Sequence, residues 1–207
     1  MPWINSGGKA VLRQSQKQSC GYCCIGMILN LVDPHRPKNS ESSLVAEGKR
    51  LDPTAYDRAA MDRVGARPTP IIHAAYEQHH KIPHWGSGTY GNHLAEVLRS
   101  YQIDAKYHGG GTVKTAMRAA TSARPLIVLV NWKAGGGHWV VVVSRSTRGL
   151  GKASDYTILD PGGHAVVNRG STNYIPPYNA QGGTFANYFV TVSGRLATPR
   201  GMKLPGM

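Results

Sequence analysis

A cysteine, a histidine and an aspartate stand in settings that suit acyl transfer by a thiol. Cys20 begins an apolar segment, His138 follows three glycines and opens the run Trp-Val-Val-Val-Val, and Asp160 ends an apolar run just before Pro161. Such chemistry needs a thiolate, a proton carrier beside it, a group that holds the carrier's ring, and donors for the oxyanion. We therefore predict Cys20 as nucleophile, His138 as proton carrier and Asp160 as the group that orients it.

Cys20 is the first residue of a helix that we predict over residues 20–32. Free N–H groups and the positive dipole end at a helix N-terminus favour a thiolate, and can lower a thiol pKa from about 8.5 to roughly 3.5–7.5. A buried helical face is indicated by apolar side chains at a spacing of three to four, at Cys24, Met27, Ile28 and Leu31. The helix is therefore predicted to be central, with Cys23 and Cys24 as core residues.

The remaining parts of a thiol site also have candidates. Gln14, six residues before Cys20, is the predicted side-chain donor of the oxyanion hole, beside the Cys20 backbone N–H. Only spacing separates it from its neighbours Gln16 and Gln18. Gly137 and Trp139 flank His138 and are predicted substrate contacts, although a core position suits Trp139 equally well.

Three competing assignments are open at this point. His164 is a rival to His138, and Asp155 is the second choice as orienter. Cys20 and Cys23 can also be paired with histidines as metal ligands, the nearby candidates being His79, His80 and His84. The chain has no second cysteine pair at zinc-site spacing, so we predict no metal and no cofactor.

Helical patterns and then strand patterns surround these residues. Residues 1–13 are predicted to be an irregular lead-in. Further helices are predicted at residues 43–49, 56–64, 91–101 and 112–123. Strands are predicted at residues 126–132, 139–144, 156–160, 164–168 and 185–192. Helices followed by strands indicate an α+β domain whose antiparallel sheet packs against the early helix.

Size and composition favour one domain over residues 1–207. The chain is 41% hydrophobic, enough for one core, which we place at about residues 10–193, with a flexible tail at about 198–207. Three cysteines confined to residues 20–24 indicate a reducing compartment. No apolar run is long enough for a membrane span and the first residues lack a signal peptide, so a cytoplasmic location where the protein is made is expected.

The formal net charge of +13 admits a nucleic-acid partner or an acidic target. The lysines and arginines are scattered, however, and form no basic block. A basic module that binds nucleic acid is therefore the less favoured function, and a generally basic surface explains the charge.

The order of these motifs resembles the papain-like cysteine peptidases and, within that clan, the bacteriocin-processing peptidases that remove double-glycine leaders. The matching features are Gln14 six residues before Cys20-Gly21, a helix of small residues, His138 before a valine run, and Asp160-Pro161. The resemblance spans roughly residues 10–193. It implies a papain-like fold with the nucleophile at the start of the central helix, and hydrolysis of peptide bonds after small residues such as glycine, through an acyl-enzyme.

The chain departs from that family at three places. Ser19 stands where many members have an acidic residue, Cys23 replaces a small alanine, and residues 145–154 lengthen the connection between His138 and Asp160. The membrane and nucleotide-binding parts of the related transporters are missing from the sequence. These differences bear on the substrate more than on the chemistry.

A free-standing basic peptidase also resembles the effector and toxin proteases that bacteria deliver through specialised secretion systems. That resemblance implies a protein or peptide substrate and a cognate inhibitor in the producing cell. The same three residues would also serve an amidase, a deamidase or an acyl transferase.

Overall fold

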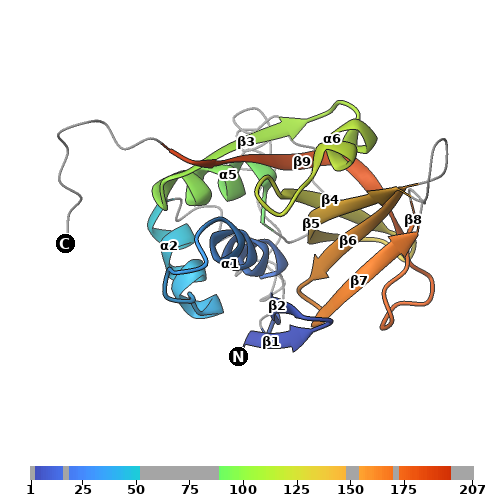
Figure 1. The fold of residues 1–207 in the computed structure, drawn as a ribbon, viewed down its shortest axis with the longest axis horizontal. Coiled ribbons are helices and arrows are strands. Elements are labelled where there is room, and N and C mark those ends of the chain that lie inside the picture. The colour runs from blue at the N-terminus through green and yellow to red at the C-terminus, as the bar shows by residue number, and fades with distance from the viewer. Residues whose placement is uncertain (1–2, 16–18, 52–88, 148–153, 170–172, 197–207) are drawn as a thin grey trace, which may run out of the picture.

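The computed structural model describes residues 3–15, 19–51, 89–147, 154–169 and 173–196 (Figure 1). Within them the chain is a mixed α+β fold, with an antiparallel sheet of seven strands and a separate two-stranded hairpin. This confirms the predicted α+β class. The predicted helix at residues 56–64 lies outside the described residues.

Helix α1 (Cys20–Val32) lies at the centre of the fold, between two of the other helices and the sheet (Figure 1). Every residue from Cys20 to Leu29 is buried. Two glycines allow close packing here, because a Cβ at Gly21 would lie 2.8 Å from Leu94 Cδ2 and one at Gly26 would lie 2.7 Å from Leu12 Cδ2. The nucleophile candidate is thus carried by the most enclosed helix of the described chain.

The large sheet has the strand order β3-β9-β4-β5-β6-β7, and β8 pairs with β9. Its strands are β3 (Ile103–Gly109), β4 (Leu126–Trp132), β5 (Gly137–Thr147), β6 (Ser154–Asp160), β7 (His164–Arg169), β8 (Asn173–Tyr174) and β9 (Gly183–Arg195). All pairings are antiparallel. The start of β5 and the end of β6 therefore lie at the same edge of the sheet.

Both faces of the sheet are covered, which explains the continuous valine run of β5. Val141 and Val143 pack in the core formed with α1, α2 (Glu41–Leu51) and α5 (Gly91–Ser100). Val140 and Val142 pack on the other face with α6 (Val113–Ala119). Because successive strand residues point to opposite faces, a strand buried on both sides needs apolar residues throughout.

Two sequence predictions are corrected here. Residues 1–13 were expected to be irregular, yet β1 (Trp3–Ser6) and β2 (Lys9–Leu12) form a hairpin closed by Gly7 and Gly8. Both glycines have positive φ, 55° and 74°, as a two-residue hairpin turn requires. The helix expected over residues 112–123 is also shorter, because the backbone of Thr121 and Arg124 forms a turn instead.

Candidate active site

Cys20 is the first residue of α1, directly after Ser19. The first N–H groups of a helix have no partner within the helix and carry its positive dipole end. Ser19 makes no side-chain cap on these groups, because its hydroxyl donates to Glu41. Cys20 is only 6% exposed, so its thiol sits in a largely water-free setting at the positive end of the central helix.

His138 and Asp160 meet where β5 begins and β6 ends. Nε2 of His138 lies 2.8 Å from Oδ1 of Asp160. An aspartate anion only accepts hydrogen bonds, so Nε2 must carry the proton that is donated. The opposite ring nitrogen, Nδ1, is then the one left to face a thiol.

The Cys20 thiol and the His138 imidazole lie close enough across the interface of α1 and β5 for each to shift the pKa of the other. Burial by itself raises the pKa of the Cys20 thiol. The hydrogen bond and charge of His138, with the backbone N–H groups of Trp139 and Gly21, bring that pKa below its ordinary value. The structure thus joins the three residues that the sequence analysis selected.

The same contacts act on the imidazole in the opposite direction. Burial lowers the pKa of His138, but the hydrogen bonds to Asp160 and Cys20 and the negative charges of both raise it to about 10. A thiol that ionises early beside an imidazole that holds its proton forms a thiolate–imidazolium pair at neutral pH.

The two other cysteines behave as core residues, as predicted. Cys23 and Cys24 are fully buried, and burial raises the pKa of both thiols well above the ordinary value. All three cysteines are free thiols. The helix therefore separates one ionisable thiol at its start from two inert thiols in its first turns.

Aromatic rings surround the His138–Asp160 pair, and the sequence analysis did not anticipate them. The Trp132 ring stacks on the His138 ring with centroids 5.4 Å apart. Tyr174 and Tyr178 both donate hydroxyl hydrogen bonds to Oδ2 of Asp160, at 2.5 Å and 2.8 Å. These rings help to keep the pair away from bulk water, and Asp160 is 0% exposed.

A glycine is required beside Asp160. The backbone N–H of Gly162 donates to Oδ1 of Asp160 at 2.6 Å. A Cβ on Gly162 would lie 2.3 Å from the Tyr178 ring. The Asp160-Pro161-Gly162 turn thus supplies the carboxylate, one of its donors and the space for the tyrosine.

Glu41 is a further residue that the sequence analysis missed. This carboxylate, 1% exposed at the start of α2, accepts hydrogen bonds from the backbone N–H of Ser15 at 3.0 Å and 3.1 Å. The hydroxyls of Ser15 and Ser19 also donate to it. Glu41 therefore ties the two described ends of the segment that leads into Cys20 to one point.

The predicted oxyanion and substrate residues lie near the pair, and their roles stay predictions. The backbone N–H of Gln14 donates to the Pro161 carbonyl at 2.8 Å, which places Gln14 beside the Asp160 turn. Gly137 is exposed where β5 opens. The Trp139 side chain is buried in the core and its Nε1 donates to the Thr89 carbonyl at 2.7 Å. Gln16 and Gln18 lie outside the described residues.

The structure also bears on the alternative assignments of the orienting aspartate, the histidine and a metal site. Asp155 is the second residue of β6 and is thus about 17 Å of extended strand from Asp160. His164 stacks on Tyr178, with centroids 5.8 Å apart, while His138 is the histidine that lowers the pKa of Cys20. The described residues contain no cluster of three or more metal-ligating side chains. The histidines of the alternative metal set, at 79, 80 and 84, lie outside that part of the chain.

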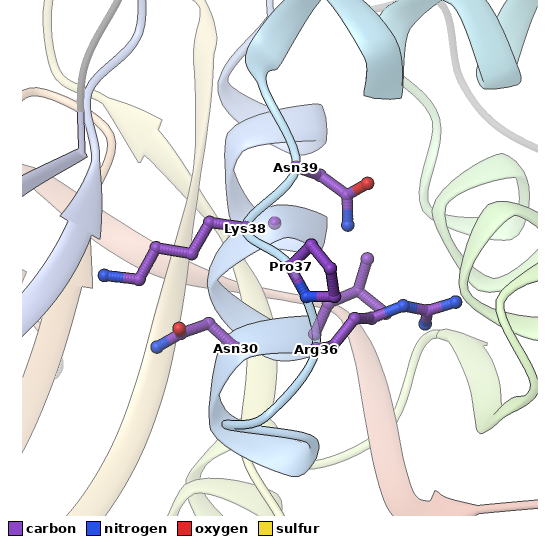
Figure 2. Close-up of a pocket in the computed structure, with 7 residues that line it drawn as sticks. Asn30, Arg36, Pro37, Lys38 and Asn39 are labelled. Carbon is purple, nitrogen blue, oxygen red and sulfur yellow. The ribbon is translucent and has the colours of Figure 1, made fainter.

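A shallow depression lies between the later turns of α1 and residues 36–39 (Figure 2). Its nearest α1 residue is Gly26, about 9 Å along the helix axis from Cys20. Arg36 and Asn39 line it, and none of the residues of the thiol site does. This depression is separate from the candidate chemistry.

A comparison with models of known protein families found no match for this chain, and a search of curated proteins found none either. In the part of the chain that the structure describes, no helix is long and apolar enough to cross a bilayer.

Proposed function

We propose that this protein is a papain-like cysteine endopeptidase with Cys20, His138 and Asp160 as its catalytic residues. The observation that carries the proposal is the juxtaposition of three groups: the Cys20 thiol at the start of α1 lies against the His138 imidazole, and that imidazole is hydrogen-bonded to the fully buried Asp160 carboxylate. This is the nucleophile, base and orienter arrangement that acyl transfer requires.

The proposed reaction proceeds through two acyl transfers. The Cys20 thiolate attacks the carbonyl carbon of the scissile peptide, and the oxyanion is held by the Cys20 N–H and the Gln14 side chain. The His138 imidazolium gives its proton to the leaving amine as the C–N bond breaks. Water then attacks the thioester with His138 as base, which releases the acid and restores the thiol.

The experiment for this proposal is mass spectrometry of the peptide termini in a lysate exposed to the wild-type protein or to Cys20→Ala. Proteolysis predicts new termini with the wild type alone, and with small residues such as glycine before the cut. Deamidation of a target predicts a mass gain of about one dalton, and acyl transfer an added adduct. Identical sets of peptides in the lysates exposed to the two proteins would contradict the proposal.

The pH dependence of hydrolysis should report the charged pair. Below the lowered pKa of Cys20 the thiol is protonated, and above about pH 10 His138 loses the proton that the leaving amine needs. We expect kcat/KM for a cleaved peptide to rise in the acidic range, stay level through neutral pH, and fall near pH 10. A single rise centred on the ordinary pKa of a thiol would contradict this expectation.

The setting suggested by the sequence, an effector or antibacterial toxin with a cognate inhibitor, is part of the same proposal and rests on the resemblance alone.

A further inference from the structure

Asp160 receives more hydrogen bonds than the orientation of a histidine requires. Oδ1 accepts from Nε2 of His138 at 2.8 Å and from the Gly162 N–H at 2.6 Å, while Oδ2 accepts from Tyr174 at 2.5 Å and Tyr178 at 2.8 Å. A carboxylate has about four lone-pair sites. All of them have a donor here, and two of the four donors are phenols.

The two phenols are held by different parts of the structure. Tyr174 ends β8, pairs with Gly183 of β9, and is fully buried with its ring packed on Phe185 at 5.8 Å between centroids. Tyr178 lies beyond β8, is 47% exposed, and stacks on His164. Two separately anchored side chains thus converge on a single oxygen atom.

Tyr178 also touches the imidazole. Its hydroxyl oxygen lies 3.2 Å from Nε2 of His138 and 2.8 Å from Oδ2 of Asp160. The terminal torsion of an aspartate is broad, so a carboxylate held only through Oδ1 could rotate away from the ring. With Oδ2 held by two phenols, Oδ1 stays directed at Nε2.

We propose that Tyr174 and Tyr178 are positioning residues, whose hydroxyls keep Asp160 as a fixed anion and thereby keep the His138 ring turned toward Cys20. This inference rests on the proposed function, because it concerns the same thiol site. The proposed role belongs to the two hydroxyl groups and is distinct from the packing of the two rings.

The direction of the effect follows from the charge on Asp160. Burial raises the pKa of Asp160, whereas the hydrogen bond and charge of His138, the Tyr174 hydroxyl and the Gly162 N–H bring it below its ordinary value. A donor to a carboxylate favours the anion, so loss of a phenol raises the pH at which Asp160 takes up a proton. A protonated Asp160 no longer balances the imidazolium, and the thiolate loses its partner.

Several other titratable groups face this carboxylate or its tyrosines. They are Cys20 and Cys24 of α1, His138 of β5, and His164 of β7 behind Tyr178, with Arg13 packed beside Gly163. Burial and the charge of Asp160 raise the pKa of both tyrosines well above the ordinary value. The phenols therefore remain donors across the range in which the other groups titrate.

Phenylalanine variants separate the hydroxyl from the ring. The rate of Cys20 alkylation by iodoacetamide would be measured against pH in Tyr174→Phe, Tyr178→Phe and the control Tyr188→Phe, which removes a hydroxyl from β9. We expect Tyr174→Phe to lower the alkylation rate at pH 6 about tenfold. The pH at which the rate rises on the acidic side of the profile should be higher by about one unit. Tyr178→Phe should act in the same direction by about threefold, because water can replace an exposed donor.

The role through Asp160 is tested by repeating Tyr174→Phe in an Asp160→Asn background. There the added effect of Tyr174→Phe should fall below about twofold, because the anion that it holds has gone. Thermal unfolding of each variant shows whether the fold is retained. The proposal is overturned if both tyrosine variants match Tyr188→Phe in rate and pH dependence, or if the effect of Tyr174→Phe persists unchanged in the Asn background.

The alkylation experiment tests the positioning role independently of the peptidase proposal, since alkylation of Cys20 needs no peptide substrate. Tyrosine variants that shift the alkylation profile in a protein that cleaves nothing would uphold the positioning role and end the peptidase proposal. Cleavage by the wild type, with unshifted tyrosine variants, would do the reverse.

Discussion

Replacing Cys20 with alanine is expected to lower peptide hydrolysis by about 10⁴-fold or more, because the variant lacks the atom that forms the acyl-enzyme. Burial and α1 packing should change little, since only a sulfur that is 6% exposed is removed. The measurement is kcat/KM for a peptide identified from the lysate experiment, together with thermal unfolding of both proteins.

The matched controls for this substitution are Cys23→Ala and Cys24→Ala. Both remove a buried thiol from the same helix, and both thiols have raised pKa values. We expect hydrolysis to stay within a few-fold of wild type in each control. An equal loss of activity in all three variants would mean that the cysteines act through packing, and the nucleophile assignment would fail.

The second large effect is expected at His138. Burial is the largest influence on the Cys20 thiol and raises its pKa, so removal of the imidazole leaves burial opposed only by the backbone N–H groups of Trp139 and Gly21. In His138→Ala the Cys20 pKa should therefore rise from below its ordinary value to above it. A shift of several pKa units is typical of buried groups and lowers alkylation at pH 6 on the order of 10³-fold.

Thiolate absorbance in the ultraviolet, followed against pH, measures this change directly. A background of Cys23→Ala and Cys24→Ala leaves Cys20 as the sole titrating thiol. His35→Ala, at an exposed position, is the control and should leave the titration unchanged. Coincident curves for His138→Ala and wild type would show that the imidazole does not stabilise the thiolate.

The elements that carry the three residues were predictable because their signals are local. The helix predicted over residues 20–32 has the observed bounds of α1, since a largely apolar segment ends at Asp33-Pro34. The strands that hold His138 and Asp160 were marked by β-branched runs between glycine-rich turns. Their meeting at one edge of the sheet then follows from antiparallel pairing of β5 and β6.

The N-terminal hairpin and β3 were missed for different reasons. Gly7-Gly8 is a turn signal, but the strands on either side of it have only four residues each, too short for a clear alternation. In β3 the buried Ile103 and Ala105 alternate with exposed residues. This alternation covers only a few residues between two predicted helices, too few to indicate a strand.

The residues that support the site depend on contacts between distant parts of the chain. Tyr174 and Tyr178 lie 14 and 18 residues after Asp160, in a segment that contains Pro176 and Pro177 and has no periodicity. They are two of ten tyrosines, with nothing in the spacing to separate them from the others. Glu41 likewise meets Ser19 across 22 residues. Such partners are visible only once the sheet edge and the helix N-terminus have been brought together.

The central claim is that Cys20 exists as a thiolate paired with a protonated His138 at neutral and mildly acidic pH. The most direct measurement is peptide mapping by mass spectrometry after brief exposure of the folded wild-type protein to iodoacetamide at pH 6. We predict an adduct on Cys20, with Cys23 and Cys24 unmodified. Modification that is equally slow at all three cysteines, or absent from Cys20, would contradict the claim.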